Sequence, residues 1–487
     1  MRRRDFLINF GLGTLAVTLF KRYPVYADQT VSKPNFILLL SDDQGWNGQS
    51  VQMNPKLAGP KNNLCKTPNL EIFAKNGMRF SRAYAPAAVC SPTRYSIQTG
   101  KTPARVRMTK AGPAMTAADN YKLVPPQHVR RIDDKEVTMA QLLKKAGYAT
   151  AHYGKWHLGS GGPGRFGYDE HDGDTDNRHA DDFGGDNPVD IFGMGSRAGD
   201  FAEKNSKLGK PFFMQLSYYA LHCPEQARKE TQQRVRLRAS QQRSSRNARS
   251  ILTAAITEDL DDGVGQLIKR IDSLGIADNT YIIYMSDNGG GGLENYPLRG
   301  GKGSLWEGGI RVPFIIRGPG IKAGSICDVP VSGFDLLPSF CELAGISQMV
   351  PEDIDGGSFV ELLAGKDDAK VQRPREELIF HFPHYQSKTD GPHSAIIQGR
   401  YKLMYFYETG KSSLFDLDED ISERNDIAKE KSELTAELEK KLKSYLSEVK
   451  AQLPVVNSLY DPNKPSSEQS DRRRASRPGG RDRRRSR

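Results

Sequence analysis

The sequence predicts an α/β protein: a doubly wound sheet with helices on both faces, followed by a smaller C-terminal unit of antiparallel strands and one helix. Unbroken apolar runs are typical of strands that are buried on both sides. Such runs occur at 36–40 and within 210–224 and 279–290. They alternate with segments of helical spacing, of which 250–275 is the longest. This alternation is typical of a layered α/β domain.

The composition changes along the chain and suggests the domain boundaries. We expect the α/β unit to span 28–370 and the smaller unit to span 371–455, where short strand-like runs precede an amphipathic helix at 431–453. The remainder, 456–487, is expected to be a disordered, Arg-rich tail, because it becomes rich in Ser, Arg and Pro from about Pro462.

The N-terminal segment 1–27 has the pattern of an export signal. A basic start precedes the apolar run Phe6–Phe20, which is short for a membrane span, and a small-residue site ends at Ala27. The letters RRDFL at 3–7 resemble a twin-arginine signal, which exports folded proteins. An ordinary secretory signal and an uncleaved anchor are the alternatives. We therefore expect an exported protein, periplasmic or secreted, that uses the export machinery as a partner.

The net charge of +11 comes from the two ends of the chain. Residues 472–487 contain nine arginines and one aspartate, and residues 1–27 contain five basic residues and one aspartate. The rest of the chain is close to neutral, so the basic character does not belong to a folded face. This argues against a nucleic-acid-binding fold, and we expect no specific nucleic-acid partner.

Hard oxygen ligands stand at the ends of two predicted strands. Asp42 and Asp43 follow the apolar run at 36–40. Asp287 and Asn288 follow the apolar residues within 279–290. In a doubly wound sheet, ligands bind outside the carboxyl ends of the strands. Four oxygen donors from two strand ends suit Ca²⁺ or Mg²⁺. The alternative is that Asp-Asp and Asp-Asn-Gly only form turns. The shared placement of both pairs favours a metal site.

Basic residues with a similar placement complete a second group. Lys155 and His157 stand two positions apart, so in an extended segment they share a face, and His222 and Lys302 end other segments. Individually, such residues are usually structural or surface groups. Together with Arg94, and beside a divalent metal, they would form a cationic pocket for a small tetrahedral oxyanion.

Cys90 begins the letters CSPTR, in which Pro92 favours a helix start. The chain has five cysteines, an odd and sparse set that forms no disulfide framework in an exported protein, and Cys90 is the candidate for the unpaired one. A helix start needs no cysteine, so a metal ligand or a nucleophile explains it better. A thiol is a poor match for hard oxygen ligands, which suggests that the working group at position 90 is not a thiol.

With these residues in place, the chain resembles a type I sulfatase, a member of the formylglycine-dependent, arylsulfatase-like family of the alkaline phosphatase superfamily. The family signature, Cys-x-Pro-Ser/Thr-Arg followed by Thr/Ser-Gly-Arg/Lys, matches 90–101 throughout. The resemblance covers roughly 34–430 and implies an alkaline-phosphatase-like mixed sheet. Five further blocks occur in the family's order: SDDQGWNG, TPNLEIFAKNGMRFSRAYA, GYATAHYGKWHLG, SDNGG and LRGGKGSLWEGGIRVPFIIRGPG.

The resemblance implies the groups that bind the metal. In this family a maturation enzyme oxidises the motif cysteine to Cα-formylglycine, so position 90 would present the hydroxyl oxygens of a hydrated aldehyde. These are hard donors, which removes the mismatch with the metal. By resemblance the ligands are Asp42, Asp43, residue 90 (Cys90 in the sequence), Asp287 and Asn288, with Ca²⁺ as the usual ion and Mg²⁺ as the alternative.

The same resemblance implies catalytic roles. Arg94 and Lys155 hold the formylglycine, His157 acts on its hydroxyl, and His222 and Lys302 hold the sulfate and assist the leaving oxygen. One hydroxyl attacks sulfur, and the alcohol leaves with a proton from His222 or Lys302. A base, His157, then removes the proton from the second hydroxyl, which releases sulfate and restores the aldehyde. A serine has no second hydroxyl for this release.

The expected activity is that of a sulfuric ester hydrolase whose partner is a sulfated small molecule or carbohydrate. The alternative enzyme is a phosphate or phosphonate ester hydrolase of the same superfamily, which the Cys90 motif and the single metal cluster disfavour. A catalytically dead glycan-binding protein would lack a pocket residue, and none is missing.

Two segments keep two interpretations each. The Arg- and Gln-rich block Glu230–Arg249 is either a solvated helix or loop, or a rim that contacts an anionic polysaccharide. The letters HFPHY at His381–Tyr385 either pack within the second unit or reach across to the pocket and set specificity. Cys223 follows His222 where the family often has Thr or Ser before Pro.

Overall fold

The computed structural model describes residues 33–57, 64–222, 224–242, 248–291, 295–366, 368–386 and 391–464. All of them belong to a compact unit that begins at Lys33. The export signal expected at 1–27, Cys223 and the end of the chain beyond 464 lie outside the described residues. In the part of the chain that the structure describes, no helix is long and apolar enough to cross a membrane.

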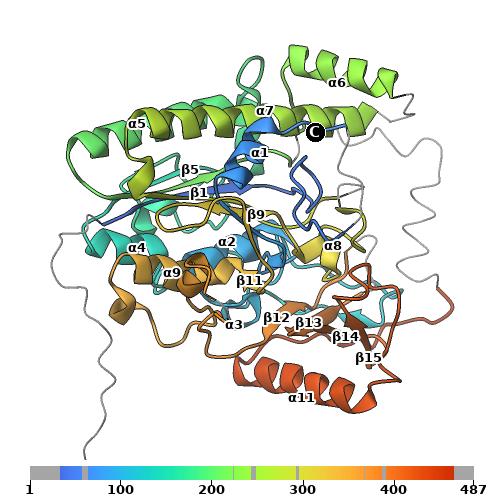
Figure 1. The fold of residues 1–487 in the computed structure, drawn as a ribbon. Helices are drawn as coiled ribbons and strands as arrows, with labels where there is room; N and C mark the ends of the chain where they lie inside the picture. Colours follow the sequence, from blue (N-terminus) through green and yellow to red (C-terminus); the bar gives the residue numbers. More distant parts are fainter. Residues whose placement is uncertain are drawn as a thin grey trace, which may run out of the picture. The chain divides into compact units, whose positions relative to one another are not determined.

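A mixed eight-stranded sheet forms the centre of the fold (Figure 1). Its strands are β1 (Asn35–Ser41), β2 (Met78–Phe80), β5 (Ala149–Gly154), β6 (Glu170–His171), β7 (Phe212–Ser217), β8 (Thr280–Ser286), β9 (Phe314–Arg317) and β10 (Ser325–Cys327). The spatial order is β10-β2-β9-β8-β1-β7-β5-β6. The strands from β8 to β6 run parallel, whereas β9 runs antiparallel to both of its neighbours. The predicted α/β fold is confirmed.

Helices cover both faces of this sheet. Successive apolar side chains along a strand point to opposite faces, so both faces are apolar and must be buried. On β1, Phe36 and Leu38 belong to one core cluster, whereas Ile37 and Leu39 belong to the other. The first face is covered by α2 (Cys90–Thr99), α4 (Met139–Lys145) and α9 (Leu336–Leu343). The second face is covered by α1 (Pro68–Lys75), α5 (Ile191–Lys207) and α7 (Ala248–Ser273). Figure 1 shows these two helical layers.

The Arg-rich block forms a helix, α6 (Lys229–Gln241), that packs on the outer side of α7 (Figure 1). Val235 and Ala239 of α6 are buried in a small apolar cluster. Arg234 of α6 forms an ion pair with the buried Glu258 of α7 at 3.1 Å. The arginines of this block therefore help to attach α6 to α7.

The C-terminal unit contains a four-stranded antiparallel sheet and one long helix, as predicted. The elements are β12 (Leu378–Phe382), β13 (His393–Gln398), β14 (Tyr401–Phe406), β15 (Lys411–Asp416) and α11 (Ser432–Glu448). One face of the sheet packs on α11 through side chains that include Ile379, Leu403 and Leu442. The other face shares a core cluster with Trp306 and Val89 of the larger unit. The two units are therefore packed together through a common apolar core.

A buried ionic network crosses the same contact. The ammonium group of Lys402, on β14, lies 2.9 Å from Glu307 Oε1 and 2.8 Å from Glu423 Oε1. Glu307 begins α8 (Glu307–Ile310), and its other carboxylate oxygen lies 3.1 Å from Arg311. All four side chains are buried. Each charge has an opposite neighbour, which offsets the cost of removing these groups from water.

The disorder expected from 456 onward does not extend over 456–464. There, β16 (Val455–Val456) pairs with β4 (Leu123–Val124), and Asn457 donates hydrogen bonds to the carbonyls of Ala118 and Tyr121. Backbone pairing with a distant loop holds this segment, and such pairing leaves no signal in composition. The remaining short elements are α3 (Pro103–Val106), α10 (Val360–Leu363), β3 (Ala83–Tyr84) and β11 (Val331–Ser332).

Candidate active site

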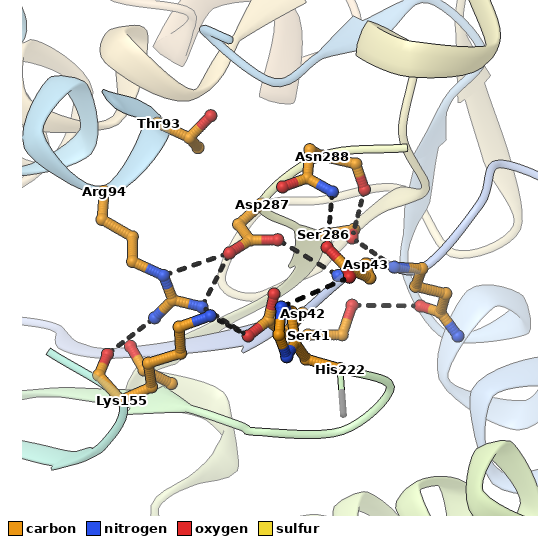
Figure 2. Close-up of polar contacts among 12 residues, drawn as sticks. Ser41, Asp42, Asp43, Thr93, Arg94, Lys155, His222, Ser286, Asp287 and Asn288 are labelled. Carbon is orange, nitrogen blue, oxygen red and sulfur yellow. Dashed lines mark hydrogen bonds and ion pairs between the residues drawn. The ribbon is translucent and has the colours of Figure 1, made fainter. Parts of the chain in front are cut away.

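The carboxyl ends of β1 and β8 place four oxygen-bearing side chains next to each other. These strands pair in parallel with Ser41 opposite Ser286, so the residues that follow them also meet. The amide of Asp43 donates to Asp287 Oδ1 at 3.2 Å, and Asn288 Nδ2 donates to Asp43 Oδ1 at 2.8 Å (Figure 2). Asp42, Asp43, Asp287 and Asn288, expected as metal ligands, are therefore brought together.

Cys90 lies at the first turn of α2 and is 2% exposed. Its Sγ atom and carboxylate oxygens of Asp42 and Asp287 all lie within 4.8 Å of one another. The turn after β1 and the turn after β8 thus face the start of α2. Three segments that are distant in the sequence therefore contribute their side chains to one small site.

Two cations approach the carboxylates from the side opposite Asn288 (Figure 2). Lys155, directly after β5, donates a hydrogen bond from Nζ to Asp42 Oδ2. Arg94, one turn along α2 from Cys90, donates to Asp287 Oδ2 and lies 3.7 Å from Asp42 Oδ2. Its Nη1 also donates to the backbone oxygen of Lys155 at 2.6 Å. All of these side chains are buried, so the two ion pairs form in a region of low dielectric.

The pKa values of the two buried carboxyl groups, Asp42 and Asp287, are shifted in opposite directions. Burial alone would raise the pKa of Asp42, but the Lys155 ammonium and the Arg94 guanidinium outweigh it and hold the pKa of Asp42 well below its usual range. Burial and the neighbouring Asp42 raise the pKa of Asp287 to about 7. Arg94 and Lys155 therefore outweigh the cost of burying Asp42 but offset that of Asp287 only in part.

A divalent cation fits this deficit. In the described part of the chain, Asp42 Oδ1 and Asn288 Oδ1 are buried oxygen atoms without a hydrogen-bond partner. Unpaired buried oxygens are costly, and here they belong to two of the five expected ligands. The donor set consists of carboxylate and amide oxygens, which suits Ca²⁺ or Mg²⁺ better than a soft metal. The residues present therefore fit a hard divalent cation.

His157, two residues after Lys155, has a left-handed backbone conformation, with φ of 57°. Thr175 holds this segment: its hydroxyl accepts from Trp156 N at 2.9 Å and donates to Gly154 O at 2.5 Å, and its carbonyl accepts from His157 N at 2.8 Å. Burial, together with Lys155 and Arg94, lowers the pKa of His157 to about 3. Burial and the two cations therefore favour the neutral imidazole of His157.

His222 and Lys302 lie at the more open side of the cluster. Lys302 Nζ donates to Asp43 at 2.7 Å, and His222 Nε2 lies 3.9 Å from Asp43 Oδ2. Their side chains remain 21% and 22% exposed, whereas Asp42 and Asp287 are fully buried. Burial lowers the pKa of His222. Burial also opposes the charge of Lys302, but Cys90 and the two aspartates raise its pKa. A ligand entering here meets a lysine that stays charged.

Three polar residues that support the site were not expected from the sequence. Ser286 Oγ accepts from Gln44 N at 3.0 Å and donates to Asn288 O at 2.9 Å, which ties the turn after β1 to the turn after β8. Thr175 fixes the Lys155–His157 segment, as described above. The only available signal was position, because Gln44 and Ser286 flank the predicted ligands, and nothing in the sequence links Thr175 to His157.

The structure also separates the two interpretations of His381–Tyr385. His381 bonds to Ser394 at 2.7 Å, and His384 bonds to Thr109 at 2.7 Å; both imidazoles are buried. The hydrogen bonds of both histidines are made within the fold, which favours the packing interpretation. Gln386, which follows this segment, does reach the turn after Lys302, because a β-carbon on Gly303 would lie 2.5 Å from Gln386 Cδ.

A fold and a site of this kind are typical of enzymes that hydrolyse phosphate or sulfate esters. Comparison with known proteins identifies the family within this class. The family model described as Sulfatase matches residues 34–346, more than half of the chain, so the chain belongs to the sulfatase family. A second model, described as N-sulphoglucosamine sulphohydrolase, C-terminal, matches 301–452. The protein is therefore a sulfuric ester hydrolase, as the Cys90 motif predicts.

Individual relatives support this membership. A protein described as Sulfatase from Formosa agariphila is 28% identical, over 92% of this chain and 93% of its own length. The Ulvan-active sulfatase of the same organism is also 28% identical, over 89% of this chain and 86% of its own. The crystal structure of Ps i-CgsB in complex with k-i-k-neocarrahexaose aligns with a TM-score of 0.69 and 26% identity, covering 85% of this chain and 93% of that one.

Proposed function

We propose that this sulfatase hydrolyses sulfate esters of a sulfated carbohydrate, with residue 90 converted to formylglycine and a divalent cation, Ca²⁺ in preference to Mg²⁺, at the cluster of carboxylates. Similarity to an ulvan-active sulfatase and to a structure solved with k-i-k-neocarrahexaose supports the substrate class. The observation that carries the site is the convergence of Cys90, Asp42 and Asp287 within 4.8 Å.

When present, a hydrated formylglycine supplies an oxygen nucleophile and a bound divalent cation supplies a Lewis acid. The chain's own residues prepare this chemistry. Arg94 and Lys155 fix the Asp42 and Asp287 carboxylates and add positive charge at the base of the pocket. Both are buried and already paired, so they need little reorganisation when a sulfate group binds.

The proton transfers are assigned to His222 or Lys302 for the first step and to His157 for the second. His222 and Lys302, on the open side, would hold the sulfate oxygens, and one of them would give a proton to the leaving alcohol oxygen. A bound sulfate would raise the pKa of His222, which burial lowers in the free protein. His157 would accept the hydroxyl proton when sulfate is released.

The burial of Cys90 supports conversion of the cysteine before the chain folds. At 2% exposure, the side chain is closed to a maturation enzyme, whereas the unfolded segment presents Cys90, Pro92 and Arg94 together. We further propose that the signal at 1–27 exports the protein to the periplasm or the medium. Fractionation of cells that produce the full chain tests this location, and retention of all activity in the cytoplasm would contradict it.

The decisive experiment is mass spectrometry of the peptide that contains residue 90, combined with sulfate release from a panel of sulfated mono- and oligosaccharides. Protein produced with a maturation enzyme is expected to show the mass of the aldehyde or its hydrate and to release sulfate. The Cys90→Ala variant is expected to keep its melting temperature and lose sulfate release. An active protein with an unmodified thiol at position 90 would refute the mechanism.

A further inference from the structure

The positive charge of the chain is distributed differently from what the letters suggest. The conspicuous Arg-rich block, at 230–249, was one candidate for binding a polyanion. In the structure, the arginines on and beside α6 lie against acidic residues: Arg228 against Asp259 at 2.8 Å, Arg234 against Glu258 at 3.1 Å and Arg249 against Glu225 at 3.1 Å. Most of the positive charge described in that block is therefore neutralised within the protein.

A second group of basic residues has no such partners. It consists of Arg107, Lys110, Arg130 and Arg131, and we call it the 107–131 patch. Within the described ranges, none of these four side chains forms an ion pair, although Lys110 is half-buried and the other three are exposed. The one acidic residue between positions 107 and 131, Asp119, pairs with Lys464.

Backbone hydrogen bonds gather these four residues on one surface. Val129 N donates to Arg107 O at 2.8 Å, which places the start of the stretch beside its end. The side chain of His128, the residue before Val129, bonds to Gly112 O at 2.9 Å. Burial lowers the pKa of His128, the hydrogen bond to Gly112 opposes this shift, and Lys110 and Arg130 lower the pKa further. The positive charges at 110 and 130 therefore lie close to the same imidazole.

The patch lies between two loops that carry site residues. On one side, Ile132 N donates to the carbonyl of Leu158, the residue after His157, at 2.9 Å. Arg131 Cβ would be 3.2 Å from a β-carbon on Gly159. On the other side, Thr109 bonds to His384, two residues before Gln386, which contacts the turn after Lys302. The patch therefore adjoins the loops that carry His157 and Lys302.

We propose that the 107–131 patch is a binding surface for further anionic groups of the substrate, so that the enzyme acts on a polyanionic saccharide with sulfate or carboxylate groups on sugars beside the one that is cleaved. This inference rests on the proposed function and makes it more specific. Unpaired cations beside a pocket attract such a chain and add affinity through several exposed contacts, each of which is weak and sensitive to salt.

The test compares two sets of charge removals in the full chain carrying Cys90→Ala, which prevents turnover. The patch variant carries Arg107→Gln, Lys110→Gln, Arg130→Gln and Arg131→Gln. The matched control carries Lys210→Gln, Lys229→Gln, Arg236→Gln and Lys269→Gln, four cations that also form no ion pair in the described structure and that lie on and around α5–α7. Both sets remove the same charge, and both proteins keep the tail.

The measured quantity is the dissociation constant for dextran sulfate oligomers at several salt concentrations. We expect the patch variant to bind about tenfold more weakly at low salt, with a flatter salt dependence, and the control to change by less than about twofold. Equal losses in both variants, or no loss in the patch variant, would overturn the proposal. Tighter binding of single-stranded DNA than of dextran sulfate at equal charge would overturn the assignment to saccharides.

Sulfate release by the maturated protein separates this inference from the proposed function. If the protein releases sulfate from a carbohydrate but the patch variant binds dextran sulfate as its parent does, only the patch assignment fails. If the patch variant loses binding but no carbohydrate releases sulfate, the polyanion surface stands and the proposed substrate class fails. With a cleaved oligosaccharide, the ratio of its kcat/KM to that of an aryl sulfate is expected to fall about tenfold in the patch variant.

Discussion

The guanidinium group of Arg94 donates two hydrogen bonds to one carboxylate oxygen, Oδ2, of Asp287, from Nε at 3.1 Å and from Nη2 at 2.7 Å. The other carboxylate oxygen of Asp287 accepts the amide of Asp43. The carboxylate is therefore fixed at both oxygens, one held from α2 and one held from the turn after β1. Its orientation is set by two elements that are distant in sequence.

Arg94→Lys is expected to reduce cation affinity and sulfate release together, each by about tenfold or more, because lysine cannot make the paired contact with Asp287 and also reach Lys155 O. Calcium titration calorimetry and steady-state kinetics measure the two effects. Arg105→Lys is the matched control: Arg105 makes a similar paired contact with Asp355, at 2.9 and 2.7 Å, away from the pocket. An unchanged calcium affinity in Arg94→Lys would contradict the positioning role.

Removal of divalent cations is expected to lower both the melting temperature and the activity, and added Ca²⁺ is expected to restore them. A ligand that binds only the folded state raises its stability, and here it would relieve the repulsion among Asp42, Asp43 and Asp287. Differential scanning calorimetry with and without a chelator measures the shift.

Asp42→Asn provides the variant for the same experiment, because it removes one expected ligand charge. The calcium-dependent shift should shrink strongly in this variant. It should persist in Asp259→Asn, in which the altered carboxylate is also buried but pairs with Arg228 and Thr231 outside the site. Equal shifts in the two variants would place the cation elsewhere.

Thr175→Val is expected to lower kcat by about tenfold, because Trp156 N and Gly154 O lose their partner and the His157 loop loses its anchor. Valine keeps the shape of threonine, so packing is preserved. Thr150→Val serves as the control: Thr150 Oγ1 donates to Gly167 O at 2.7 Å, away from the pocket. If both variants lose stability but neither loses kcat, Thr175 supports the fold only.

The titration of Glu423 makes the free energy of unfolding depend on pH. Burial and the charge of Glu307 raise its pKa to about 7 although Lys402 opposes them, whereas its ordinary value is 4.5. As pH rises from about 4.5 to 7, the unfolded state loses this proton first, so the folded state becomes less stable relative to it.

Glu423→Gln should remove that loss because the amide stays neutral. The melting temperature of the variant, relative to wild type, is expected to rise by about 2 °C or more between pH 5 and pH 8. Glu419→Gln, at an exposed position on the same loop, should show no such trend. A constant difference between wild type and Glu423→Gln across this pH range would contradict the titration.

The sequence allowed the strands that carry the site to be predicted because each ends in a recognisable polar letter group. Asp42 follows an uninterrupted apolar run, and Asp287 follows another, so both the fold class and the meeting of these residues could be inferred. The site residues that came from the resemblance, such as His157 and Lys302, lie on loops whose course depends on tertiary hydrogen bonds. Thr175 was missed for that reason.

The distribution of charge was the least predictable feature. Glu258 and Asp259 lie in a helix predicted for its apolar spacing, so nothing indicated that they would face the arginines of the preceding block. Conversely, Arg107 and Arg131 are scattered over a stretch without a pattern, and only the folded backbone gathers them. The pairing of Val455 and Val456 with residues more than three hundred positions earlier was hidden in the same way.

The contact of Lys402 with both Glu307 and Glu423 has a consequence for exchanging parts between sulfatases. A recombination point near 371 appears natural in the sequence, yet it would take Lys402 and Glu423 from one parent and Glu307 and Arg311 from the other. A chimera with a mismatched set would bury an unbalanced charge next to α8, five residues from Lys302. Chimeras with exchanged C-terminal units should therefore fold when all four residues come from the same parent. Engineering of specificity by such exchanges should keep these four residues together.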